Sequence, residues 1–128
     1  MRFEGDNGRR AYLGTDDATR PPDPTLPIRW HELDDHEYDT ALNELDQWVD
    51  WLIHRYRLDA RTIPECWACH GEVVEELAAL RRSWAGAFHP EASDSSAGLK
   101  WHADFADARI RLVDWVAETG CRFDVHRR

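Results

Sequence analysis

The chain has 128 residues, a length that argues for one domain rather than two. Hydrophobic residues make up 42% and charged residues 32%, which is the composition of a foldable protein and excludes a chain that is disordered throughout or embedded in a membrane. The formal net charge is −9, from 25 acidic and 16 basic residues, so we expect no direct binding of nucleic-acid phosphates.

The first segment of the chain differs in composition from the rest. Residues 1–27 contain four of the six prolines and three of the seven glycines, with mixed charge and few large apolar groups. This pattern predicts a flexible polar arm, or a segment that becomes ordered on contact with a partner, followed by a single helical domain over 28–128. The start lacks the apolar core of a signal peptide, and no apolar run reaches the ~20 residues of a membrane span. We therefore expect a cytoplasmic protein with no membrane association, whose cysteines are reduced or metal-bound.

A first helix is predicted to begin after Asp34, which is followed three residues later by Glu37 as in a capping box. Apolar residues then recur at spacings of three and four, which predicts one buried helix face: Leu42, Leu45, Val49, Leu52 and Tyr56. The apolar period stops near Leu58, where we expect the helix to end. Trp51 falls outside this face.

A second helix is predicted from the capping-box pattern Thr62-Ile63-Pro64-Glu65, with Gly71 bending it or separating its first turns. Its buried face is predicted to hold Val73, Leu77, Leu80, Trp84 and Phe88. It should end at His89-Pro90, because the residue before a proline is disfavoured in helical conformation.

A third helix is predicted over about 99 to 119, with Gly120 as its C-terminal cap. Its inner face should hold Trp101, Phe105, Ala108, Leu112, Trp115 and Val116. Leu99, Ile110 and Val113 lie away from that face, which favours self-association or a protein partner. No run has the period of a strand, so the predicted fold is all-α: an antiparallel bundle of three main helices.

Cysteine and histidine form two spaced pairs, Cys66 with His70 and Cys121 with His126. Cys66 and His70 are four apart, a spacing that places both on one face of a helix. If the second and third helices are antiparallel, the two pairs meet at one end of the bundle and form a candidate zinc site. His102 lies nineteen residues before Cys121, about 28 Å along a helix, so it is predicted to be remote.

Other interpretations of these residues stay open. The thiols can pack in the core without metal, and Cys66 and Cys121 can form a disulfide if oxidised. Cys69 is a possible substitute ligand. Cys66-Trp67-Ala68-Cys69-His70 also matches the haem-attachment pattern, but haem is disfavoured because no export signal precedes it and the single methionine is Met1.

Residues 28–50 hold eight acids and one base, Arg29. The pattern is typical of a solvated helix face, and its functional alternative is an acidic mimic of nucleic acid that binds a basic partner.

Five short blocks carry a family resemblance: Ile63-Pro64-x-Cys66-Trp67-x-x-His70, Glu75-Glu76-Leu77-x-Ala79-Leu80, Trp101-His102, Gly120-Cys121-Arg122 and His126-Arg127. Over about residues 45 to 128 the chain resembles small proteins of unknown function in high-GC Gram-positive bacteria, encoded beside plasmid-transfer, integrative-element or phage genes. The resemblance implies a joint role for Cys66, His70 and Cys121. It leads us to expect a non-enzymatic accessory or adaptor protein of a mobile element with a structural Cys/His site. The alternative is a thiol-dependent enzyme or redox protein with an exposed Cys66 of depressed pKa.

Overall fold

The computed structural model describes residues 23 and 25–121, and within them every regular element is a helix. Two of these elements are single 3₁₀ turns and three are long α-helices: η2 (Trp30–Glu32), α1 (Asp35–Tyr56), η3 (Trp67–Cys69), α2 (Gly71–Ala87) and α3 (Ala97–Thr119). The all-α fold class is confirmed. None of the helices in this part of the chain is long and apolar enough to cross a membrane. Most of the predicted arm, and His126, lie outside the described residues.

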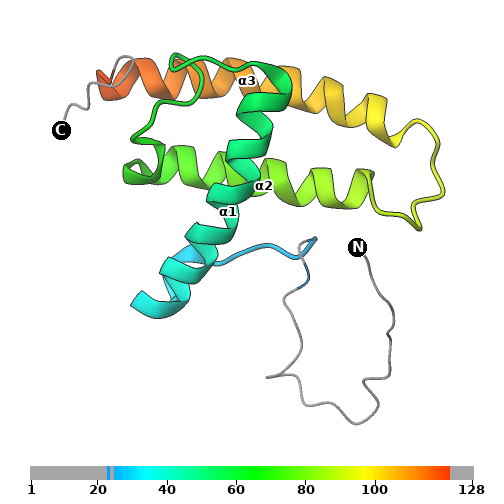
Figure 1. Ribbon diagram of the computed structural model, residues 1–128, viewed down its shortest axis with the longest axis horizontal. Coiled ribbons are helices and arrows are strands. Elements are labelled where there is room, and N and C mark those ends of the chain that lie inside the picture. Colours follow the sequence, from blue (N-terminus) through cyan, green and yellow to red (C-terminus); the bar gives the residue numbers. More distant parts are fainter. Residues whose placement is uncertain (1–22, 24, 122–128) are drawn as a thin grey trace, which may run out of the picture.

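Helices α2 and α3 run side by side in opposite directions, and α1 crosses this pair and packs against α2 (Figure 1). The antiparallel relation of α2 and α3 is the one that the sequence predicted. An ion pair ties the two helices together: Arg111 donates two hydrogen bonds of 3.0 Å to the carboxylate of Glu76. The beginning of α2 and the end of α3 therefore lie at the same end of the molecule.

Helix α1 begins with the predicted capping box. The Glu37 N–H donates to the Asp34 carboxylate at 2.8 Å, and the Asp34 N–H donates to the Glu37 carboxylate at 2.9 Å. The helix ends at Tyr56, two residues before the predicted end. Arg57 takes a left-handed conformation with φ of 56°, and this lets the Leu58 N–H return to the Ile53 carbonyl while the Leu58 side chain enters the core.

The predicted start of the second helix at Thr62 is wrong. α2 begins at Gly71, and the preceding residues form turns closed by short-range bonds, such as the 3.0 Å bond from the Trp67 N–H to the Pro64 carbonyl. Ile63, Pro64 and Trp67 are all buried within these turns. Thr62 is buried as well, so three consecutive residues, Thr62, Ile63 and Pro64, all enter the core. A continuous helix would spread three consecutive residues over about 200° of its circumference, whereas the turns bury all of them.

Helix α3 begins at Ala97, two residues before its predicted start, and ends at Thr119 as predicted. Its predicted inner face is buried except for the half-buried Trp115: Trp101, Phe105, Ala108, Leu112 and Val116. Trp51, which falls outside the predicted face of α1, packs against Trp84 with ring centres 5.1 Å apart. It thus forms the edge of an aromatic cluster between α1 and α2.

Candidate metal centre

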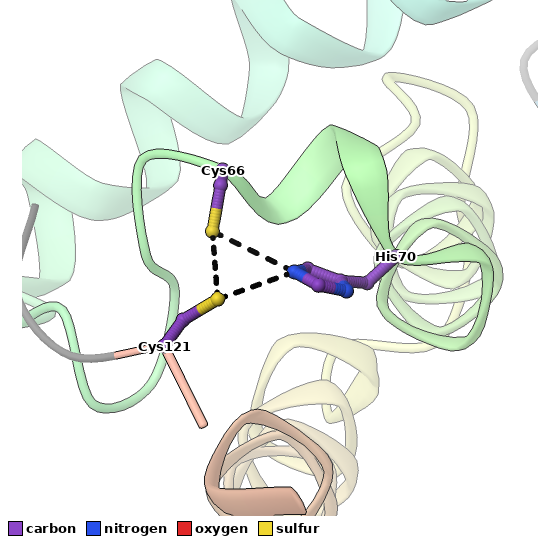
Figure 2. Close-up of side chains that lie close together, drawn as sticks. All are labelled: Cys66, His70 and Cys121. Carbon is purple, nitrogen blue, oxygen red and sulfur yellow. Dashed lines mark hydrogen bonds between the residues drawn. The ribbon is translucent and has the colours of Figure 1, made fainter. Parts of the chain in front are cut away.

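Three side chains from two segments of the chain meet at the end of the α2–α3 pair. Cys66 precedes η3, His70 lies between η3 and α2, and Cys121 follows α3 (Figure 2). Cys66 Sγ lies 3.3 Å from Cys121 Sγ and 3.6 Å from His70 Nε2, and Cys121 Sγ lies 3.4 Å from His70 Nε2. These three ligand atoms are close enough to hold one metal ion.

The turn of η3 places Cys66 and His70 together. The Cys69 N–H donates to the Cys66 carbonyl at 2.9 Å, and the His70 N–H donates to the Trp67 carbonyl at 3.1 Å. The buried Trp67 anchors the turn in the core. The sequence predicted that these two residues would meet on one face of a helix. They meet instead across a 3₁₀ turn, because α2 starts only after His70.

The end of α3 places Cys121. Gly120 adopts a left-handed conformation with φ of 78°, which ends the helix and turns the chain. The Thr119 hydroxyl donates to the Val116 carbonyl at 2.6 Å and accepts from the Cys121 N–H at 3.1 Å. Cys121 is buried as a result, at 4% exposed. The predicted convergence of Cys121 with Cys66 and His70 is thereby confirmed.

Thr119 is the positioning residue that sequence reasoning missed. Its hydroxyl fixes the turn between α3 and Cys121, a function that resembles that of a capping side chain. A threonine two residues before a cysteine, beside a predicted helix-ending glycine, is the signal that was present in the sequence.

The electrostatic environment disfavours a free thiolate at this position. Burial, together with the hydrogen bond and the charge interaction with the neighbouring Cys121 thiol, raises the pKa of the Cys66 thiol to about 11. Without a cation, Cys66 is therefore protonated at neutral pH, the opposite of the depressed pKa that a nucleophilic cysteine needs.

The remaining candidates lie apart from the cluster or outside the described residues. Cys69 is exposed and does not join the group, so its predicted role as substitute ligand finds no support in the arrangement. His102 lies on α3 beside the end of α1, where its Nε2 is 3.1 Å from the Tyr56 hydroxyl, in agreement with its predicted exclusion. His126, the predicted fourth ligand, lies outside the residues that the structure describes.

A second feature is a surface cavity of about 570 Å³ between α1 and the segment that precedes η3. Four carboxylates line it together with an apolar wall that includes Trp67: Asp46, Asp50, Asp59 and Glu65. Part of the acidic run of residues 28–50 therefore faces a hollow rather than a flat solvated surface.

The chain was compared with protein-family models, curated proteins and solved structures, and none matches.

Proposed function

We propose that this protein is a non-enzymatic helical adaptor whose fold is closed at one end by a structural zinc ion held by Cys66, His70 and Cys121. The observation that carries the proposal is the triangle of two sulfurs and one imidazole nitrogen, with sides of 3.3 to 3.6 Å. The three donors come from two segments far apart in the sequence, the turn around η3 and the residue after α3, so one ion would tie these two segments together.

The size of the triangle fits zinc. The circle through the three ligand atoms has a radius of about 2.0 Å, so an ion about 1 Å above their plane lies at the usual zinc–sulfur and zinc–nitrogen distances of about 2.3 and 2.1 Å. Two cysteines and a histidine are also a common zinc ligand set. A structural zinc ion takes four ligands, and His126, five positions beyond Cys121, remains our predicted fourth.

The non-enzymatic part of the proposal rests on the chemistry of the two thiols, and the adaptor part rests on the family resemblance. The raised pKa of Cys66 and the burial of Cys121 disfavour thiol chemistry at this site. An ion here would instead stabilise the fold, because metal binding to residues far apart in sequence contributes directly to the folding free energy. Association with a mobile genetic element is part of the proposal through the family resemblance of the Cys-Trp-x-x-His and Gly-Cys-Arg blocks.

The test is elemental analysis of the untagged protein, purified without chelator, for zinc and iron together. We expect about one zinc per chain in the wild type and in Cys69→Ser, and little or none in Cys66→Ser and Cys121→Ser. His126→Ala should weaken zinc binding whereas His102→Ala should not. A wild-type protein that takes up no zinc even after incubation with excess Zn²⁺ would refute the proposal.

A second candidate function is recognition of a basic protein, and the acidic cavity beside Trp67 favours it. Carboxylates above an apolar wall suit an arginine side chain, which carries its charge at the end of an apolar stem. The probe is a fluorescent arginine-rich peptide, measured by anisotropy. Asp50→Asn/Glu65→Gln should weaken binding at least about threefold, whereas Asp104→Asn/Glu118→Gln, with the same change in net charge on α3, should not. Equal effects of both pairs would indicate non-specific attraction by the net charge.

A further inference from the structure

Helix α3 has a second apolar stripe on the side away from the core. We call this stripe the outer seam, and its six residues are all exposed: Leu99, Ala103, Ala106, Ile110, Val113 and Ala117. Leu99 is 75% exposed and Ile110 is 64% exposed, the two largest values among the exposed large apolar residues of the described chain. The inner face of the same helix is already packed against the rest of the protein. The outer seam is thus a surface separate from the core, and in the described structure only Val113 borders another segment, at a hollow that Arg57, Asp59, Arg61 and Thr62 also line.

The spacing of the outer seam is that of a coiled coil. Its residues follow one another at intervals of four, three, four, three and four, which is a continuous heptad pattern over almost the full length of α3. A helix that packs only in a globular core needs no such stripe on its solvent side, where polar residues are expected. The alanines at Ala103, Ala106 and Ala117 allow a second helix to approach closely.

Charged side chains border the outer seam asymmetrically. On a helix with about 3.6 residues per turn, Arg109 and His102 lie along one edge of the seam, and Asp107 and Asp114 lie along the other. In a parallel pair of helices, a residue on the first edge faces the residue five positions later on the second edge of the partner. Arg109 of each copy then faces Asp114 of the other. The Arg109 guanidinium lies over the Phe105 ring of its own chain, 5.6 Å from the ring centre, a contact that uses none of its N–H donors. His102 faces Asp107, but its Nε2 already lies 3.1 Å from the Tyr56 hydroxyl of its own chain, so Arg109 and Asp114 carry the pairing.

An antiparallel pair with the same seam in register gives a less favourable arrangement. It places Arg109 against Arg109 and Asp107 against Asp107 near the middle of the interface, where like charges repel. It also places Lys100 near Asp114, but Lys100 is already paired with Asp94 of its own chain at 2.9 Å. The charges therefore favour the parallel alignment and a partner with the same sequence.

We infer that α3 is the interface of a parallel two-fold homodimer, in which the outer seam packs against the outer seam of a second copy. Each half of such an interface is the same surface patch, as two-fold symmetry requires. The inference is independent of the zinc proposal, because its residues lie on the solvent side of α3 and take no part in the cluster of Cys66, His70 and Cys121.

The first test measures the mass of the full chain by sedimentation equilibrium over a wide concentration range. The monomer mass is 14.9 kDa, and we expect it to rise toward twice this value with concentration. Ile110→Glu should give a monomer with unchanged helix content by circular dichroism. Leu26→Glu is the matched control, because Leu26 is 60% exposed but lies outside the seam, and it should dimerise like the wild type. The inference is refuted if the wild type stays monomeric at every concentration, or if the Ile110→Glu variant dimerises like the wild type. The outer seam would then not be the interface between two copies of this chain.

The second test exchanges charges across the interface. Arg109→Glu and Asp114→Arg should each weaken dimerisation by roughly tenfold, because each places like charges opposite one another at two symmetric positions. The double variant Arg109→Glu/Asp114→Arg restores opposite charges and has the net charge of the wild type, so it should recover most of the lost affinity. If the free energy of dimerisation lost in the double variant equals the sum of the losses in the two single variants, the parallel alignment is wrong.

The third test reports the alignment directly. In a parallel dimer each seam residue lies beside its own copy, so Ala106→Cys in a Cys69→Ser background should form a disulfide between protomers. Oxidised glutathione is the oxidant: it accepts the two electrons of the two thiols and leaves as two reduced glutathione molecules. Glu118→Cys in the same background, which lies off the seam, should cross-link much less. Equal cross-linking of the two variants contradicts the proposed interface.

Discussion

Cys66 and Cys121 are 55 positions apart in the chain, and their sulfur atoms lie 3.3 Å from each other. The contact links the turn before α2 to the residue that follows α3. Each partner is placed by its own local device, the 3₁₀ turn for Cys66 and the left-handed Gly120 for Cys121. A link between such distant residues, whether through metal or sulfur, would reduce the conformational freedom of the unfolded chain substantially.

The ligand variants should separate a metal site from packed thiols by their thermal stability. Cys121→Ser should lower the melting temperature by roughly 10 °C or more, because loss of one ligand removes most of a metal contribution of several kcal/mol. Cys69→Ser, an exposed thiol outside the cluster, should stay within about 0.5 kcal/mol of the wild type. Melting followed by circular dichroism gives both values. A drop of only a few degrees in Cys121→Ser would indicate simple packing.

Removal of the metal should have the same effect as removal of a ligand. A strong chelator should lower the melting temperature of the wild type by roughly as much as Cys121→Ser does, and should leave that variant unchanged, because the two changes remove one interaction. Added Zn²⁺ should restore the wild type and not the variant. Additive effects of chelator and substitution would argue against a shared site.

Thiol reactivity should distinguish the three cysteines. In the native protein we expect an alkylating reagent at neutral pH to modify Cys69 rapidly, because it is exposed. Cys66 and Cys121 should react slowly, since burial raises the pKa of Cys66 and Cys121 is buried. Peptide mass mapping after short labelling times identifies the sites. Rapid labelling of Cys66 would support the alternative of a thiol-dependent enzyme.

Asp94 should make stability depend on pH at the start of α3. Its carboxylate accepts hydrogen bonds from the Ser96 hydroxyl, the Lys100 ammonium and the Ser96 N–H, which together hold the pKa of Asp94 below its ordinary value of 3.8. A depressed pKa means that this stabilisation is complete at neutral pH and is lost as the pH falls below 3.8. Asp94→Asn should therefore be less stable than the wild type in urea at neutral pH, with a difference that narrows in acid. Asp104→Asn is the matched control, because it removes one carboxylate from α3 and leaves the hydrogen bonds of Asp94 in place.

Two buried tryptophans provide a matched test of hydrogen bonding in the core. The Trp101 Nε1–H donates to the Ser83 hydroxyl at 3.1 Å, whereas nothing in the described part of the chain accepts from the buried Nε1–H of Trp48. Replacing either tryptophan by phenylalanine removes the same side-chain volume. Trp101→Phe should therefore cost about 1 kcal/mol more than Trp48→Phe in chemical denaturation, from the lost hydrogen bond. The same Nε1–H also donates to the Leu80 carbonyl at 3.3 Å, so equal losses would show that the hydrogen bonds of Trp101 to these two acceptors contribute nothing.

The sequence by itself determined the features that depend on residues close together in the chain. The Asp34–Glu37 capping box, the apolar face of α3 and the Gly120 cap are all visible in it, because each arises within a few helical turns. The topology then predicted the meeting of Cys66, His70 and Cys121, since an antiparallel pair of helices brings these positions to one end.

Where a local sequence pattern and burial favour different conformations, the tertiary structure determined the outcome. The capping-box pattern at Thr62–Glu65 predicts a helix start, but the burial of three consecutive residues, Thr62, Ile63 and Pro64, favours a set of turns, and α2 begins only at Gly71. Trp51 acquires its place only because α2 brings Trp84 beside it. Burial is a property of the whole chain, so no short segment can specify it alone.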